Sequence, residues 1–239
     1  MASSLFKFKL MPNKSDKISS EQPIRSELFS AYQMGLHGEH LAKSHRDTEN
    51  ITSDQLLYQL KENETVINKA CNLLTIAVKD KRQITPASEW LLDNHPLIAQ
   101  HIRLARKHLP KGYSRGLPRL YNGNTIGNPR VYELALEIIS HSDARIEIEP
   151  LNVFINSYQK ISPLKLGELW AIPIMLRLAL IENLRRVAAR IYLSRVNRNH
   201  ADYWADRMID VVENDPTNLI LVIADMARSK PSLEPAFIV

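Results

Sequence analysis

The sequence predicts an all-α fold, a multi-helix bundle with a long central helix and one long basic loop. Only seven of the 239 residues are glycine, and leucine, alanine, isoleucine, glutamate, arginine and lysine are plentiful, which favours helices. From Pro23 onward, apolar residues recur at helical spacing. Helix start signals such as Thr85-Pro86 separate these stretches. The hydrophobic content of 44% is enough to form a buried core.

The first two helices are predicted from their capping residues and apolar spacing. We expect the first to follow Ser26 as N-cap and to extend to about His45. A polar linker comes next. Ser53 or Asp54 can then cap a long amphipathic helix that reaches about Val78.

The third helical stretch has the clearest start signal. Thr85 is a good N-cap with Pro86 at the first helical position, and Glu89 completes an approximate capping box. Pro96 lies inside the pattern, so we expect the helix to break or kink there. Pro110 ends it.

The second half of the chain begins with an irregular connection and continues with helices. Residues 110–130 contain four of the seven glycines and three prolines, which predicts the main irregular region. Asn128 is expected to cap the helix that follows. The predicted helices after the connection are 129–141, 150–160, 164–196, 203–212 and 218–227.

The apolar segment from Leu169 to Ile181 predicts the core of the long central helix. It has almost no polar side over three turns, so we expect it, Trp170 included, to be enclosed all round. It is too short to span a membrane and contains Arg177. A buried Arg177 requires a structural ion pair, and three carboxylates are candidates: Glu133, Glu137 and Glu168.

The basic loop is the clearest charge feature of a chain with net charge +5. Between positions 103 and 130 there are seven Arg and Lys residues and no Asp or Glu. Such a loop can bind phosphate groups, or its side chains can pair with acids elsewhere in the fold, which we favour. The candidate anion or interdomain contacts are Lys111, Tyr113, Arg115, Arg119 and Arg130.

Past Ile181 the long helix becomes polar on one side. Glu182 and Arg186 are spaced i, i+4, and Arg185 continues the basic character. This pattern predicts an exposed amphipathic face, which is either simply solvated or in contact with another domain or an anionic membrane surface.

The cysteine, the histidines and the missing motifs argue against a disulfide, a metal site and a catalytic site. Cys71 is the only cysteine, so it cannot form an intrachain disulfide, and this suits a reducing compartment. The spacing His37-x-x-His40 is the nearest to a metal-ligand pattern, but without a third ligand we predict no metal site. Hydrolase, phosphate-loop, dinucleotide and Asp-x-Asp motifs are missing, and we predict no catalytic residue in this chain.

Two segments are predicted. Residues 1–23 are expected to be a flexible lead-in without a signal-peptide core. Residues 24–239 are expected to form one helical domain. It ends on the apolar residues Phe237, Ile238 and Val239, which predicts that the sequence is truncated at its C-terminus.

Four strings resemble the cyclic β-1,2-glucan synthase family. They are EWLLDNH at 89–95, LPKGY at 109–113, PRVYELA at 129–135 and SPLKLGELWAIPIMLRLALIENLRR at 162–186. The sequence departs from the family pattern at Ser162, where the family has threonine, and at Gly116, where an acidic residue is expected. The resemblance covers roughly residues 86–193.

The resemblance implies the N-terminal helical region of a very large inner-membrane enzyme. Family members also contain a transferase domain that uses UDP-glucose with a divalent metal, membrane helices and a phosphorylase-like domain. By resemblance, this chain is an accessory domain on the cytoplasmic side of the bacterial inner membrane. It would pack on the transferase domain, without a cofactor, transmembrane segment or nucleic acid of its own. The alternative is a free-standing helical module that binds nucleic acid or another polyanion through the basic loop.

Overall fold

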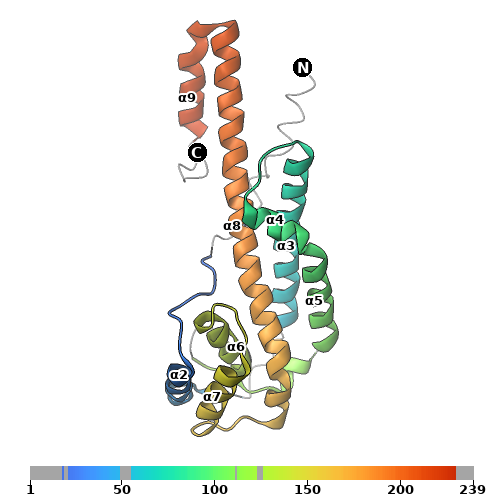
Figure 1. Ribbon diagram of the computed structural model, residues 1–239, viewed down its shortest axis with the longest axis vertical. Coiled ribbons are helices and arrows are strands. Elements are labelled where there is room, and N and C mark those ends of the chain that lie inside the picture. Colours follow the sequence, from blue (N-terminus) through green and yellow to red (C-terminus); the bar gives the residue numbers. More distant parts are fainter. Residues whose placement is uncertain (1–17, 19–20, 49–54, 111, 123–125, 230–239) are drawn as a thin grey trace. The chain divides into compact units, whose positions relative to one another are not determined.

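The computed structural model describes residues 18, 21–48, 55–110, 112–122 and 126–229. In these residues there are eight α-helices, two short 3₁₀ helices and two strands of two residues each (Figure 1). The predicted all-α class and long central helix are confirmed. Among the described helices, none is both long enough and apolar enough to cross a membrane.

The chain divides into two compact units. Of the described residues, the first unit comprises 18, 21, 68–93 and 188–229, and the second comprises those within 22–67 and 94–187. Helix α3 (Leu56–Lys79) and helix α8 (Leu166–Asn214) are each divided between the two units. The predicted lead-in at 1–23 and the caps at Ser53 and Asp54 fall mostly or wholly outside the described residues.

In the second unit, helix α2 (Ala31–Ser44) packs against helix α7 (Ile148–Gln159) (Figure 1). The helix begins later than predicted because Ser30 forms a capping box with Gln33, accepting from its backbone N–H at 3.3 Å. The predicted cap Ser26 instead donates its backbone N–H to the carbonyl of Ser140 at 2.9 Å.

The predicted break near Pro96 is confirmed. Helix α4 (Pro86–Asp93) belongs to the first unit and helix α5 (His95–His108) to the second, with Asn94 as N-cap of α5. Thr85 caps α4 by accepting from the Ser88 N–H at 3.3 Å. Ser88 occupies the third helical position, where a capping-box partner belongs, and its hydroxyl lies 2.8 Å from that of Thr85, so the prediction of Glu89 was one residue late.

Helix α6 (Arg130–His141) follows the connection, and Pro129 rather than Asn128 occupies its N-cap. The side-chain oxygen of Asn128 is buried without a hydrogen-bond partner, so the predicted cap is wrong. Helix α8 runs without a break through residues 197–202, although two separate helices were predicted at 164–196 and 203–212. Arg195 donates from Nε to Asn199 Oδ1 at 2.8 Å, an i, i+4 contact that supports the helix in this polar stretch.

In the first unit, Arg195 also donates to the carbonyl of Gln83 at 3.0 Å, and Arg82 donates to Asp202 at 3.1 Å. These bonds fix the segment before α4 to α8. A 3₁₀ helix η2 (Pro216–Asn218) and helix α9 (Leu219–Ser229) then turn back beside the end of α8, where Arg207 pairs with Asp225 at 3.1 Å (Figure 1).

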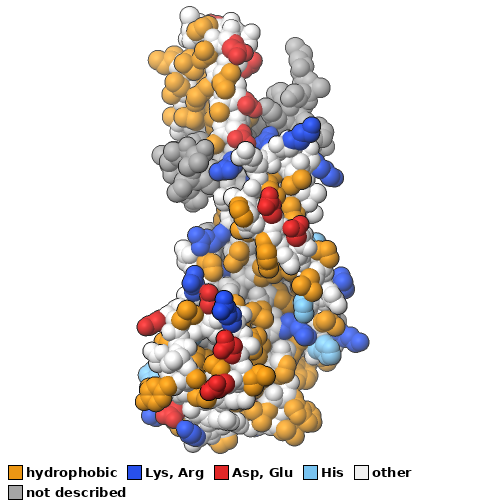
Figure 2. Space-filling model, viewed as in Figure 1, with side chains coloured by type: hydrophobic (Ala, Val, Ile, Leu, Met, Phe, Trp, Pro, Cys, Tyr) orange, Lys and Arg blue, Asp and Glu red, His pale blue; other side chains and the backbone are white. Residues whose placement is uncertain are grey.

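Helix α9 leaves an apolar face exposed. Hydrophobic side chains gather over this helix in the space-filling view (Figure 2). The exposed residues are Ile220, Leu221 and Ile223, whereas Val222 between them is buried.

Candidate functional site

The predicted basic loop is largely folded into short ordered pieces. A 3₁₀ helix η1 (Tyr113–Gly116) is followed by strand β2 (Arg119–Leu120), which pairs antiparallel with strand β1 (Asp47–Thr48). Tyr113 is half-buried and Arg115 is exposed. Lys111 lies outside the described residues.

Arg119 is an interior residue of this connection, with only 1% of its surface exposed. Its guanidinium donates to the carbonyl oxygens of Gly127 at 2.5 Å and Ser114 at 3.1 Å. A second bond reaches the Ser114 hydroxyl at 3.2 Å. Arg119 therefore links two distant parts of the connection, because the carbonyl groups of Ser114 and Gly127 accept from one guanidinium.

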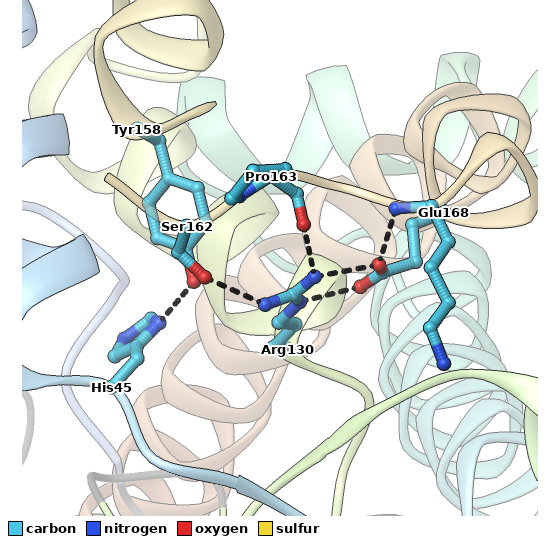
Figure 3. A network of polar contacts seen from close by, with 7 residues as sticks. His45, Arg130, Tyr158, Ser162, Pro163 and Glu168 are labelled. Atoms are coloured by element: carbon cyan, nitrogen blue, oxygen red, sulfur yellow. Dashed lines mark hydrogen bonds and ion pairs between the residues drawn. The ribbon is translucent and has the colours of Figure 1, made fainter. Parts of the chain in front are cut away.

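Arg130 is the centre of a second buried network (Figure 3). Its guanidinium makes a bidentate pair with Glu168, Nε to Oε1 at 2.6 Å and Nη2 to Oε2 at 2.8 Å. It also donates to the Ser162 hydroxyl and the Pro163 carbonyl, both at 2.8 Å. Glu168 is fully buried and accepts the Lys165 N–H at 2.8 Å as well. The network joins the start of α6 to the start of α8.

A neighbouring hydrogen bond adds α2 and α7 to this region of the second unit. The ring nitrogen Nδ1 of His45 lies 3.0 Å from the hydroxyl of Tyr158, which is fully buried (Figure 3). These hydrogen bonds of Arg130, Glu168, His45 and Tyr158 all join parts of the same unit. The arrangement is suited to fixing helix ends in place.

These positions correct part of the prediction for the basic loop. Arg119 and Arg130 were candidate anion or interdomain contacts, but both are buried and bound to the protein interior, and Arg130 pairs with an acid elsewhere in the fold, which was the favoured alternative. Burying a guanidinium requires such partners, since an unpaired buried charge costs several kcal/mol. Among the described candidates, Arg115 and Tyr113 retain exposed surface.

The candidates on α8 differ from expectation in burial. Trp170 was predicted to be enclosed but is 73% exposed. Arg177 is half-buried rather than enclosed. Of its predicted partners, Glu168 pairs with Arg130 instead. The buried arginine that pairs with Glu168 is thus Arg130 and not Arg177.

Farther along α8, Glu182 lies between two arginines. It accepts from Arg185 and, at 2.8 Å, from Arg186, which confirms the predicted i, i+4 pair. These side chains are half-buried, so the face is less exposed than predicted. Nearby, burial and the charge of Glu182 raise the pKa of Tyr132, so this tyrosine stays protonated.

Three ionisable side chains that were not predicted as a site meet between α2 and α6. His37 Nε2 lies 2.8 Å from Glu137 Oε2, and His141 Nε2 lies 3.5 Å from the same oxygen. Burial alone would raise the pKa of Glu137, but the hydrogen bond and charge of His37 and the charge of His141 lower it overall. One atom from each residue lies within 4.8 Å of the others, which is close enough to share a cation.

A cavity of about 330 Å³ opens beside this cluster. Phe29 and His141 form part of its lining, together with Arg145 and Glu147. The sequence did carry one signal for the cluster, the i, i+4 spacing of Glu137 and His141 on a helix. His37 could not be assigned to it from sequence, because it lies 100 residues from Glu137.

A comparison with curated proteins finds sequence similarity between this chain and a small part of a much longer protein. Over 156 residues, 65% of this chain, the sequence is 38% identical to the cyclic β-(1,2)-glucan synthase NdvB of Rhizobium meliloti (strain 1021). This span is 5% of the length of NdvB. No family model matches the sequence. The resemblance inferred from the sequence is thereby confirmed.

Proposed function

Because 156 of its residues correspond to a region of a cyclic β-(1,2)-glucan synthase, we propose that this chain is an accessory helical domain of such a synthase. It would lie in the N-terminal region and would not be catalytic alone. UDP-glucose and a divalent metal would bind in the transferase domain, outside this chain. Its place would be the cytoplasmic side of the inner membrane.

One observation in the structure supports a packing role in particular. At the start of α8, the apolar residues Leu166, Trp170 and Pro173 are all exposed, Leu166 by 61% and Trp170 by 73%. Their spacing of four and then three residues places them on one face of the helix. We call these three residues the α8 apolar stripe.

The helical turn that carries the α8 apolar stripe is fixed by the hydrogen bonds of Glu168. Glu168 points to the opposite side of the same helical turn, where it is fixed by Arg130 and by the Lys165 N–H. Tryptophan is among the residue types enriched at the centres of protein interfaces. The proposed partner is the transferase domain of the synthase, which would cover this stripe.

The proposal is tested by measuring binding between this chain and a separately expressed transferase-bearing part of the synthase. We expect a saturable complex in biolayer interferometry, and at least tenfold weaker binding for Trp170→Ala, a loss of 1.4 kcal/mol. Trp90→Ala is the matched control, since Trp90 is 55% exposed on α4 and lies outside the stripe. Absence of any complex would contradict the proposal.

The non-catalytic part of the proposal has its own test. The isolated chain, incubated with UDP-glucose and Mg²⁺ or Mn²⁺, should release no UDP and form no glucan. Product formation that scales with the concentration of the chain would show that it carries a catalytic site.

A further inference from the structure

His37, Glu137 and His141 converge on one point between two helices of the second unit. His37 comes from α2, and Glu137 and His141 occupy successive turns of α6. Glu137 Oε2 lies 2.8 Å from His37 Nε2 and 3.5 Å from His141 Nε2. Two imidazole nitrogens and a carboxylate oxygen are a ligand set that zinc commonly takes in proteins.

The surroundings of His141 determine which of its nitrogens carries a proton. Its Nδ1 lies 2.7 Å from the backbone carbonyl of Glu27, and a carbonyl can only accept. Nδ1 must therefore be the donor. In the neutral ring, Nε2 then presents a lone pair toward Glu137 Oε2, another acceptor. A metal ion placed between these two atoms would accept electron pairs from both of them.

The bond to Glu27 is also the contact that metal-binding histidines characteristically make. Such histidines donate their remaining ring N–H to a carbonyl or carboxylate, which fixes the tautomer and the ring orientation. Phe29 further restricts the ring of His141 by stacking on it, with centroids 3.9 Å apart and planes within 10°. His141 is thus oriented by two contacts before any ion arrives.

We propose that His37, Glu137 and His141 bind one divalent transition-metal ion of the zinc class, with water in the remaining position. Zinc–ligand bonds of 2.0–2.2 Å in a tetrahedron separate the ligand atoms by roughly 3.3–3.6 Å, so His37 and Glu137 need to part by about half an ångström. The three side chains are 19%, 20% and 11% exposed, which leaves a path for the ion and a water. The ion would link α2 to α6.

This site is separate from the metal of the proposed transferase domain. It also differs from the His37-x-x-His40 pattern in the sequence, because His40 is exposed and the other ligands come from α6. The site therefore stands or fails independently of the proposed function.

The test uses the full chain without a histidine tag, stripped with a chelator and dialysed. Isothermal titration with Zn²⁺ and metal analysis should give one ion per chain. Co²⁺ should give the intense visible absorption of four- or five-coordinate cobalt instead of the weak absorption of the hydrated ion. His141→Ala and the near-isosteric Glu137→Gln should each weaken zinc binding at least tenfold.

His40→Ala is the matched control, since it removes an exposed histidine from the same helix as His37 and should leave zinc binding unchanged. Circular dichroism checks that each variant is folded. The Co²⁺ spectrum is measured on the unaltered chain, so it tests the proposal even if a variant does not fold. Absence of zinc binding at micromolar concentrations, or equal binding by Glu137→Gln, would overturn the proposal.

Discussion

Arg130 shows what a single side chain contributes to this fold. It is 4% exposed and is bound to fully buried Glu168 through two short hydrogen bonds. Removing one member of a buried ion pair leaves the other charge uncompensated, which costs about 3–5 kcal/mol. We therefore expect Arg130→Met to lower the free energy of unfolding by about that amount. Urea denaturation followed by circular dichroism measures it.

Two further variants separate the ion pair from a general effect of losing arginine. Arg115→Met removes an exposed arginine of the same connection and should change stability by less than about 0.5 kcal/mol. The double variant Arg130→Met/Glu168→Leu leaves no orphaned charge, so it should lose less than the sum of the two single losses. Strict additivity would show that the two side chains act independently.

Cys71 is a residue whose environment predicts low reactivity. It is 4% exposed, and burial raises the pKa of its thiol to about 11. Because the thiolate is the reactive form, a thiol reagent at pH 8 should modify the folded chain far more slowly than the chain in concentrated urea. Equal labelling rates in the two conditions would contradict the burial of this side chain.

The same pKa gives a dependence of stability on pH. The ordinary value of 9.0 applies to the unfolded chain, so between pH 9 and about 11 the folded state holds the proton more tightly. The contribution of this thiol to stability is complete below pH 9 and is lost as the pH rises through that interval. Cys71→Ala should lose less stability from pH 8 to pH 10.5 than the unaltered chain.

At the scale of elements, the contact between α2 and α7 depends on a close approach at Gly38. A Cβ atom added there would lie 2.6 Å from the backbone carbonyl oxygen of Phe154, which cannot move aside. Alanine favours a helix by about 1 kcal/mol over glycine, but overpacking costs roughly 1–3 kcal/mol. We expect Gly38→Ala to lower the melting temperature despite its better helix propensity.

Alanine substitutions at two other glycines serve as comparisons for the change in melting temperature. A Cβ at Gly116 would meet no atom within 4 Å, so Gly116→Ala should leave the melting temperature nearly unchanged. At Gly35 the nearest atom is 3.0 Å away and belongs to the side chain of Val153, so the loss should be smaller than at Gly38. A stabilised Gly38→Ala variant would show that α2 and α7 lie farther apart.

Elements with local signals were predictable, and those with distant partners were not. The start of α4 after Thr85 and the break before Pro96 follow from backbone rules that involve a few residues. The burial of Arg130 depends on Glu168, 38 residues away, and nothing near Arg130 in sequence indicates it. The start of α2 was misplaced because Ser26 and Ser30 are both good caps, and only Ser30 has glutamine three residues later.

The same limit applies to Trp170. An apolar segment with no polar side predicts burial all round, but the pattern cannot distinguish a surface covered by this chain from one left open. Ala171, Met175 and Ala179 on the inner side of α8 are fully buried, as predicted, whereas Trp170 is exposed. Sequence identified the apolar helix correctly and could not say which of its faces this chain covers.

At the scale of the whole molecule, exposed apolar residues remain on α9 as well as in the α8 apolar stripe. The α9 residues Ile220, Leu221 and Ile223 are 73%, 60% and 45% exposed. Contiguous exposed apolar surface in a separate chain promotes association. If the rest of a synthase covers this face in the complete enzyme, the isolated chain should self-associate through it.

We therefore expect the isolated chain to sediment faster as its concentration rises, and Ile220→Ser/Leu221→Ser to remain monomeric over the same range. Both side chains are exposed, so the double variant should unfold at nearly the same urea concentration as the unaltered chain. Leu97→Ser is the control, since it removes an exposed leucine from α5 and should leave association unchanged. Sedimentation velocity across a concentration series measures all three. A chain that stays monomeric throughout, or equal association by the double variant, would show that the α9 face does not drive association.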